Sequence, residues 1–355
     1  MSDTADLAAA GQSLWVDNIT RELLDTGVIQ QFADEFSVTG LTSNPSIFDK
    51  AITDSTSYDA QIKSLAKEGV VAEECFFELA IDDLRRAADI FRPVHDSTNG
   101  LDGWVSLEVS PELADDAPNT IAAAKKLHAQ AGKKNLFIKI PGTPAGLVAI
   151  EETIAAGVPV NVTLLFSTEH YLAAADAYTK GLERRLAAGQ DLNVCSVASL
   201  FISRWDVAVA KEVPGDLKDK LGIAIGADAY AAYRTFIASE RVQKLVAAGA
   251  PIQRLLFAST GTKDPDASDT LYIQGLAAPE TINTMPDGTL RAFHDHGVVT
   301  GVLAADGGDS AEVFAAITDA GVDLDALAAR LQDEGKTSFV SAWKELLDSI
   351  EQKAK

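Results

Sequence analysis

Cysteines, basic residues and long apolar runs are scarce in this 355-residue chain, and each scarcity argues against a class of protein. Its two cysteines, Cys75 and Cys195, cannot build a disulfide framework, and we expect both to be small core residues. The 30 basic residues against 52 acidic ones give a formal net charge of −22, which opposes binding to nucleic acid or an anionic membrane. No stretch has the length and apolarity of a membrane span, and residues 1–12 lack the basic start of a signal peptide. We therefore expect a cytoplasmic protein, and the sequence leaves open whether it is a monomer or a homodimer.

The chain does contain enough apolar sequence for a large core, since 47% of its residues are hydrophobic. Short apolar runs alternate with longer amphipathic ones, such as the helical patterns over 72–91 and 120–133. The short runs show little polar alternation, which is typical of strands buried on both faces of a parallel sheet. Eight strands are expected, over 14–19, 38–44, 103–110, 135–140, 159–166, 193–201, 254–259 and 271–276.

Eight strands separated by helices predict an α/β fold, a (β/α)8 TIM barrel, in a single domain over 1–355. The barrel itself is expected over about 14–300, and extra C-terminal helices over about 305–352 are expected to pack on its outside. The alternative is an open doubly wound sheet. That fold often carries a Gly-rich dinucleotide loop after its first strand, and no such loop is present here.

A polar or ionisable side chain stands near the C-terminal end of almost every predicted strand, where active sites of such barrels lie. In chain order these residues are Asp17, Thr42, Asn44, Glu108, Lys139, Asn161, Thr163, Ser199 and Ser259. Lys139 is the most unusual, because it interrupts the apolar run 135–140 and an unpaired buried ammonium is costly.

This set has the chemistry of a class I aldolase-type site. A lysine removed from water is less favoured as an ammonium, and its free amine attacks a ketone to form a Schiff base. Glu108 would serve the dehydration step, and Asp17 would take a hydroxyl proton as a carbon–carbon bond breaks. Simpler explanations stay open: Lys139 could extend to solvent, and Asp17 or Asn44 could cap a turn or helix.

Two other motifs carry weaker signals. His294 and His296 are expected in a solvated loop rather than at a metal, because no third ligand stands nearby. The glycines of 142–146 lack the spacing of a phosphate-binding P-loop and indicate a strand-to-helix turn.

The sequence resembles the transaldolase family, in the longer form found in actinobacteria and related bacteria. The matching stretches are GLTSNPSIF (40–48), VSLEVSPELADD (105–116), NLFIKIPGT through NVTLLFS (135–167), SVASLFISRWD (196–206), LFASTGTKDP (256–265) and LYIQGLAAPETINTMP (271–286). The resemblance implies a (β/α)8 barrel of the pentose phosphate pathway that needs no metal or organic cofactor. It also implies transfer of a dihydroxyacetone unit from sedoheptulose 7-phosphate to glyceraldehyde 3-phosphate, giving erythrose 4-phosphate and fructose 6-phosphate.

The resemblance assigns roles to particular residues. The Schiff-base lysine of the family falls on Lys139, its acid/base aspartate on Asp17, and its strand-three glutamate on Glu108. The threonine that shares a catalytic water with the glutamate falls on Thr163. The residues implied to bind the sugar phosphates are Thr42, Asn44, Asn161, Ser199, Phe201, Arg204 and Ser259, with Arg204 on the phosphate.

Two departures and two alternatives accompany this resemblance. Ser110 to Glu112 stand where many members continue with Asp-Ala-Arg, and the arginine expected after Ser259 is missing. We expect Lys263 to supply the positive charge of that arginine, beside Arg204.

One alternative function is a lyase that cleaves fructose 6-phosphate or a related ketose phosphate, and the other is a non-catalytic barrel that binds sugar phosphates. The lack of a tyrosine near strand six favours the transferase, and a binding protein needs no buried amine.

Overall fold

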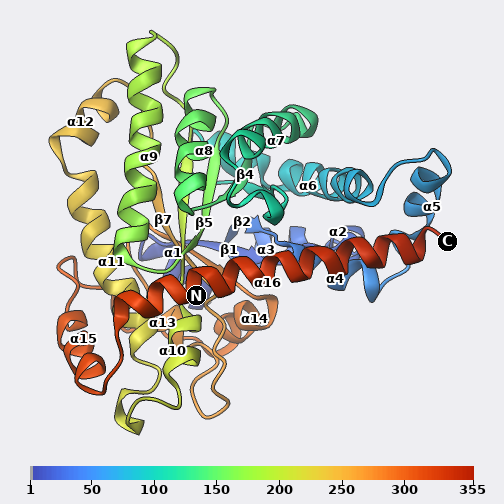
Figure 1. Ribbon diagram of the computed structural model, residues 1–355. Coiled ribbons are helices and arrows are strands. Elements are labelled where there is room, and N and C mark those ends of the chain that lie inside the picture. Colours follow the sequence, from blue (N-terminus) through green and yellow to red (C-terminus); the bar gives the residue numbers. More distant parts are fainter. Residues whose placement is uncertain (1–2) are drawn as a thin grey trace.

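The computed structural model describes residues 3–355, and its centre is a barrel of eight parallel strands enclosed by helices (Figure 1). The strands are β1 (Ser13–Asp17), β2 (Val38–Thr42), β3 (Val105–Glu108), β4 (Leu136–Pro141), β5 (Val160–Leu165), β6 (Ser196–Phe201), β7 (Arg254–Ala258) and β8 (Ile282–Met285). They follow the order β2-β1-β8-β7-β6-β5-β4-β3, and the amide of Leu41 bridges the remaining seam to the carbonyl of Trp104 at 3.0 Å. The predicted TIM barrel is confirmed. Residues 1 and 2, which begin the predicted domain and the segment expected to lack a signal peptide, lie outside the described residues.

Helices precede, separate and follow the strands. They are α1 (Asp3–Ala9), α2 (Arg21–Asp25), α3 (Val28–Glu35), α4 (Pro45–Thr53), α5 (Asp59–Lys67), α6 (Ala72–Ser97), α7 (Ala117–Ala131), α8 (Pro144–Ala155), α9 (Thr168–Ala187), α10 (Ser203–Val209), α11 (Leu221–Ile237), α12 (Glu240–Ala247), α13 (Leu271–Gly275), α14 (Asp287–His296), α15 (Ser310–Asp319) and α16 (Leu324–Lys353), with 3-10 turns η1 (Pro111–Leu113) and η2 (Gly215–Leu217). The two helical patterns noted in the sequence correspond to α6 and α7. The turn expected at 142–146 is confirmed, because Thr143 caps α8 through the amide of Gly146.

The eighth strand was predicted in the wrong place. Residues 271–276 contain the short helix α13, and β8 follows it at Ile282–Met285. Tyr272 and Ile273 of α13 are buried, and its apolar side chains give this helix the composition of a buried strand. Because β8 carries the polar residues Asn283 and Thr284, its pattern lacks the apolar run that marks the other strands.

Aromatic side chains fill the barrel lumen at the N-terminal ends of the strands. Trp104 stacks on Phe137 with ring centroids 4.1 Å apart, and Trp15 lies 6.3 Å from the same ring. The indole of Trp15 donates to Asp102 at 2.8 Å, and the guanidinium of Arg254 lies 3.7 Å from that carboxylate. This packing fills the barrel at the N-terminal ends of its strands.

The C-terminal segment is helical as predicted, but its position differs from the prediction. Figure 1 shows α16 as one long helix that crosses the molecule from the region of α15 toward α4 and α5. Rather than lying only on the barrel's outside, it passes over the C-terminal end of β5. There Gly335 faces Leu164 and Phe166 so closely that a Cβ on it would lie 3.0 Å from the Leu164 side chain.

Neither cysteine forms a disulfide, and the histidine motif is helical. Cys75 is buried as expected, whereas Cys195 is half-buried.

His294 and His296 belong to the last turn of α14, so the predicted loop is wrong. Within residues 3–355 no group of three His, Cys, Asp or Glu side chains is arranged to hold a metal ion. Over the same range, no helix is long and apolar enough to cross a membrane.

Candidate active site

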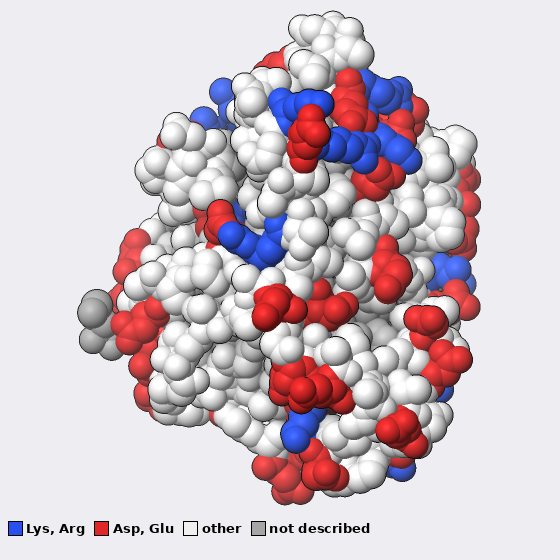
Figure 2. All heavy atoms as spheres, turned by 90° about the vertical axis from the view of Figure 1, so that its left-hand side faces the viewer, with Lys and Arg blue, Asp and Glu red and all other residues white. Residues whose placement is uncertain are grey.

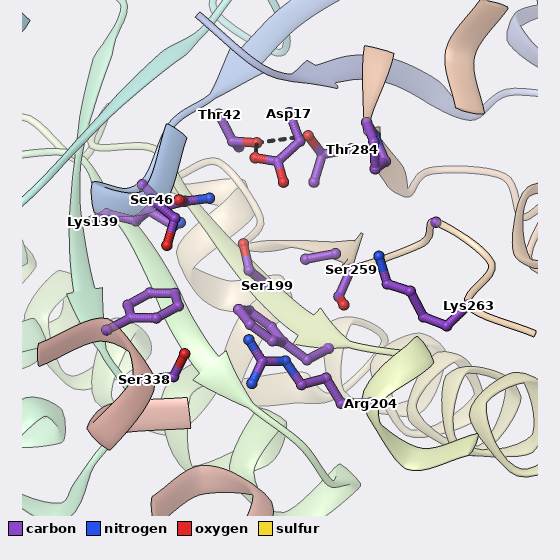
Figure 3. Close-up of a pocket in the computed structure, with 16 residues that line it drawn as sticks. Asp17, Thr42, Ser46, Lys139, Ser199, Arg204, Ser259, Lys263, Thr284 and Ser338 are labelled. Atoms are coloured by element: carbon purple, nitrogen blue, oxygen red, sulfur yellow. Dashed lines mark hydrogen bonds between the residues drawn. The ribbon is translucent and has the colours of Figure 1, made fainter. Parts of the chain in front are cut away.

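A cavity of about 230 Å³ opens among the C-terminal ends of the strands (Figure 3). The predicted site residues that line it are Asp17, Thr42, Asn44, Lys139, Ser199, Phe201, Arg204, Ser259 and Lys263. They come from five strands or the segments that follow them, far apart in the sequence. The barrel therefore brings together most of the residues that the sequence predicts for one site.

Lys139, which lines this cavity, forms a buried ion pair with Glu108, which does not line it. They are register partners on β3 and β4, and the lysine Nζ lies 3.3 Å from the glutamate Oε2. The side chains are only 6% and 4% exposed, so Lys139 does not extend to solvent. Nζ also donates to the carbonyl of Ser43 at 3.2 Å. Burial raises the pKa of Glu108, against the opposing effect of the Lys139 charge, so this carboxylate readily accepts a proton.

Asp17 stands at the end of β1 and lines the same cavity as Lys139. It accepts a hydrogen bond from the hydroxyl of Thr42 at 2.7 Å, and that hydroxyl lies 2.7 Å from the hydroxyl of Thr284 on β8. Loss of hydration raises the pKa of Asp17, whereas the charges of Lys139 and Lys263 and the Thr42 hydrogen bond act in the opposite direction. The position suits a group that takes up and returns a proton.

Asn161 and Thr163 flank Lys139 but do not line the cavity. On β5, Asn161 pairs in register with Lys139 and Thr163 pairs with Pro141. The Asn161 amide donates to Ser106 at 3.1 Å and accepts from Ser199 at 2.7 Å, so its side chain is already engaged. The buried Thr163 hydroxyl has no hydrogen-bond partner among residues 3–355. The roles assigned to both residues stay predictions.

Asn44 fits both explanations that the sequence left open. Its side chain accepts a hydrogen bond from the amide of Ile47 at 3.1 Å and so caps α4, which begins at Pro45. It also lines the cavity, beside Ser46 from the first turn of the same helix. The cap fixes the asparagine at the mouth of the barrel and leaves its amide nitrogen free of any hydrogen bond within the described part of the chain.

Two unpaired cations lie on the opposite side of the cavity from Lys139. Figure 3 shows the side chains of Arg204 and Lys263 on either side of Ser259. In the part of the chain that the structure describes, neither has an ion pair or a hydrogen bond. Burial lowers the pKa of Arg204, and a guanidinium keeps its charge in proteins. Unpaired cationic groups in a protein of net charge −22 indicate an anion-binding subsite.

Several lining residues were missed by sequence reasoning. Helix α16 contributes Ser338 and Phe339, and the Phe339 ring lies 5.9 Å from the Lys139 Nζ and 6.4 Å from the Phe201 ring. Thr284 was missed because β8 was misplaced. The amphipathic pattern of α16 identifies its buried face but carries no signal for the surface that this face covers.

These features define a (β/α)8 barrel with a lysine–carboxylate pair in its C-terminal mouth. Residues 14–350 match the family described as Transaldolase/Fructose-6-phosphate aldolase, and the chain belongs to this family. A protein named transaldolase from Renibacterium salmoninarum is 44% identical over 99% of this chain and 96% of its own length. A transaldolase from Arthrobacter sp. is 45% identical, covering 98% of this chain and 96% of that protein. A protein named transaldolase 2 from Nostoc punctiforme is 41% identical, covering 97% of this chain and 96% of that protein.

Proposed function

We propose that the chain is a transaldolase that transfers a dihydroxyacetone unit from sedoheptulose 7-phosphate to glyceraldehyde 3-phosphate through a Schiff base on Lys139. The observation that carries the proposal is the buried pair of Lys139 and Glu108, 3.3 Å apart, whose lysine lines a cavity together with Arg204 and Lys263. A binding protein for sugar phosphates needs the cations but has no use for a buried amine. Family membership and the names of the relatives support the same activity.

The first stage forms the Schiff base. Glu108 takes a proton from the ammonium across the 3.3 Å contact, which leaves a free amine and a carboxylic acid. The amine attacks the C2 carbonyl of the ketose, and the carbinolamine that results loses its hydroxyl as water after Glu108 returns the proton. Thr163 assists by holding this water beside Glu108. The product is an iminium ion on Lys139.

The second stage breaks and remakes a carbon–carbon bond. Asp17 takes the proton of the C4 hydroxyl, the C3–C4 bond breaks, and its electron pair moves into the iminium to give an enamine. Erythrose 4-phosphate leaves. The enamine carbon then attacks the aldehyde of glyceraldehyde 3-phosphate, and Asp17 returns its proton to the new hydroxyl. Hydrolysis of the Schiff base releases fructose 6-phosphate and restores the lysine.

Binding groups divide into two sets in this proposal. Thr42, Asn44 and Ser199, which line the cavity, and Asn161, which accepts a hydrogen bond from Ser199, hold the hydroxyls of the dihydroxyacetone unit. Arg204, Ser259 and Lys263 hold the phosphate. Phe201 and Phe339 place aromatic surface beside the lysine, which limits the water that would release free dihydroxyacetone. The cytoplasmic location stays a prediction, which cell fractionation would check.

Trapping with borohydride tests the proposal. The protein is incubated with fructose 6-phosphate and borohydride, and the reduced adduct is located by peptide mass mapping. We expect the adduct on Lys139, its loss in Lys139→Met, and a fall in kcat of about 10³-fold or more. Lys211→Met, a change at an exposed lysine on the loop after α10, serves as the matched control.

A second measurement separates transfer from cleavage. With fructose 6-phosphate and erythrose 4-phosphate together, a transferase forms sedoheptulose 7-phosphate, whereas a lyase releases free dihydroxyacetone. An adduct at another residue, or no adduct at all, would contradict the assignment of Lys139.

A further inference from the structure

The strand that carries Thr163 ends in an unusual backbone conformation. Leu164 has a φ of 59°, in the left-handed region that a leucine rarely adopts. The pairing of β5 with β6 shifts register between Val162 and Leu165, so the irregularity is a bulge that directly follows Thr163. A conformation of this kind persists only when neighbouring structure holds it in place.

A glutamine from the C-terminal helix contacts this bulge. The side-chain amide of Gln332 on α16 donates to the carbonyl of Leu164 at 2.9 Å and to the carbonyl of Gly142 at 3.3 Å. One side chain therefore bridges the ends of β4 and β5. Gly335, one turn further along α16, lies against the same leucine, where a Cβ would be 3.0 Å from Leu164 Cδ2. The helix is fitted to the bulge by a hydrogen bond and by a close approach.

Thr163 depends on this backbone support. Its hydroxyl is buried and has no hydrogen-bond partner within the described residues, so no side-chain hydrogen bond fixes its direction. Its carbonyl accepts a hydrogen bond from the amide of Gly142 at 2.7 Å. Gly142 is thus held on one side by Thr163 and on the other by Gln332.

We propose that Gln332 is a positioning residue: its amide holds the left-handed Leu164 and thereby aims the Thr163 hydroxyl toward the Lys139–Glu108 pair. Gln332 does not line the cavity, and it acts on the reaction through Thr163. The inference rests on the proposed function, because it gives Thr163 a part in Schiff-base chemistry.

A double-mutant cycle tests this coupling. The measured quantity is the rate at which the borohydride-trapped adduct forms with fructose 6-phosphate. We expect Gln332→Leu, which keeps the volume and removes the donor, to slow adduct formation by about 10- to 100-fold. Thr163→Ala is expected to slow it as well, and the double variant to be no slower than Thr163→Ala alone. Gln352→Leu, at the exposed end of α16, is the control and is expected to react like the wild type.

A nearly isosteric variant gives a second readout. In Gln332→Glu the ionised carboxylate cannot donate to the two carbonyls, whereas the protonated carboxyl can donate one hydrogen bond. We expect the rate relative to wild type to recover at about pH 5 and to fall at about pH 8, with circular dichroism unchanged. A structural defect alone would not follow this pH profile.

Three outcomes overturn the inference. These are an unchanged adduct rate in Gln332→Leu, an equal loss in the wild-type and Thr163→Ala backgrounds, or a Gln332→Glu variant whose relative rate is flat with pH. Failure of the proposed function looks different, since the wild-type protein would then form no adduct on Lys139.

Discussion

At the scale of single residues, Lys139 shows how the surroundings set the chemistry of a side chain. Its strand neighbours Ile138 and Ile140 turn away from the lumen, while Lys139 and Phe137 turn into it. Register then places Glu108 beside the lysine. The solvent-exposed alternative is wrong, because only 6% of the lysine side chain is exposed. The sequence predicted Glu108 as the acid/base partner of this lysine, and the register of the two strands shows how the two side chains come to lie 3.3 Å apart.

Asp17 is predicted to reduce stability in return for activity. Desolvation raises the pKa of Asp17 in the folded state. The protonated carboxyl therefore stabilises the fold fully at pH values below the unfolded-state pKa near 3.8, and this stabilisation is lost as the pH rises through the folded-state pKa. We therefore expect Asp17→Asn to increase the free energy of unfolding at pH 7 by about 1 kcal/mol, while turnover is abolished. Denaturant unfolding at pH 7 and at about pH 3 gives the free energy of unfolding of the wild type and of Asp17→Asn at each pH.

The gain from Asp17→Asn should shrink toward zero at the acid pH, where the wild-type carboxyl is itself neutral. Asp216→Asn, at an exposed position in η2, is the control and should change stability little at either pH. A loss of stability at pH 7 would show that the charge of Asp17 supports the fold.

Lys263 is predicted to bind phosphate in place of the missing arginine. Loss of one charge-assisted hydrogen bond weakens binding by about 1.5–3 kcal/mol, so Lys263→Ala should raise the Michaelis constants for both phosphorylated substrates by at least about tenfold. Lys263→Arg should retain most of the affinity because it keeps the charge. Steady-state kinetics with Lys211→Ala as the control measures this. Unchanged Michaelis constants in Lys263→Ala would show that Lys263 does not bind the phosphate.

At the scale of elements, seven strands were predictable because most of them are apolar runs buried on both faces. The eighth was not, because Asn283 and Thr284 make β8 look like a loop and the apolar residues of α13 look like a strand. The error had a chemical consequence. Thr284, which contacts the Thr42 hydroxyl beside Asp17, could not be placed at the site from the sequence.

Helix α16 illustrates a second limit of sequence reasoning. Its periodicity correctly predicts an amphipathic helix, but periodicity gives the direction of the buried face and not its partner. Phe339 and Gln332 both belong to that helix, and both contacts span more than a third of the chain. Such contacts are set by tertiary packing alone.

Phe339 is predicted to influence how often water releases free dihydroxyacetone from the enzyme instead of the unit being transferred to the acceptor aldehyde. Its ring lies 5.9 Å from the Lys139 Nζ, and it is 7% exposed. Phe339→Leu should open space for water at the Schiff base and raise the ratio of free dihydroxyacetone to transferred product by several-fold, on the order of 3- to 10-fold. Product analysis by mass spectrometry gives the ratio. The control is Phe314→Leu on α15, which does not line the cavity, and an unchanged ratio in Phe339→Leu would rule out the effect.

At the scale of the whole molecule, charge is distributed unevenly. Figure 2 shows separate clusters of acidic residues on the face that carries α9, α11 and α15, with basic and acidic residues interleaved at one end. Many surface arginines are paired, as Arg241 is with Asp176 and Glu183. The cavity differs, because Arg204 and Lys263, which line it, form no ion pair with a carboxylate of residues 3–355. An anionic substrate therefore meets attraction at the mouth of a molecule whose net charge repels it.

We further propose that barrel and C-terminal helices form a single domain, and Trp343 provides the test. This α16 side chain is 1% exposed and meets Phe76 of α6 edge to face at 5.0 Å. Lys336 and Lys353 add ion pairs to Asp115 and Asp59, so one helix joins distant parts of the chain. Truncating a buried tryptophan costs about 3–5 kcal/mol.

Trp343→Ala is therefore expected to lower the thermal midpoint by roughly 5 °C. In a single domain, the midpoints for activity loss and for far-UV circular dichroism should fall together, because undocking of α16 exposes apolar surface on α4 and α6 and removes the support of β5. Val302→Ala, at a position 49% exposed, is the control and should leave both midpoints in place. If activity were lost well below an unchanged circular dichroism midpoint, α16 would be a unit that separates before the barrel unfolds.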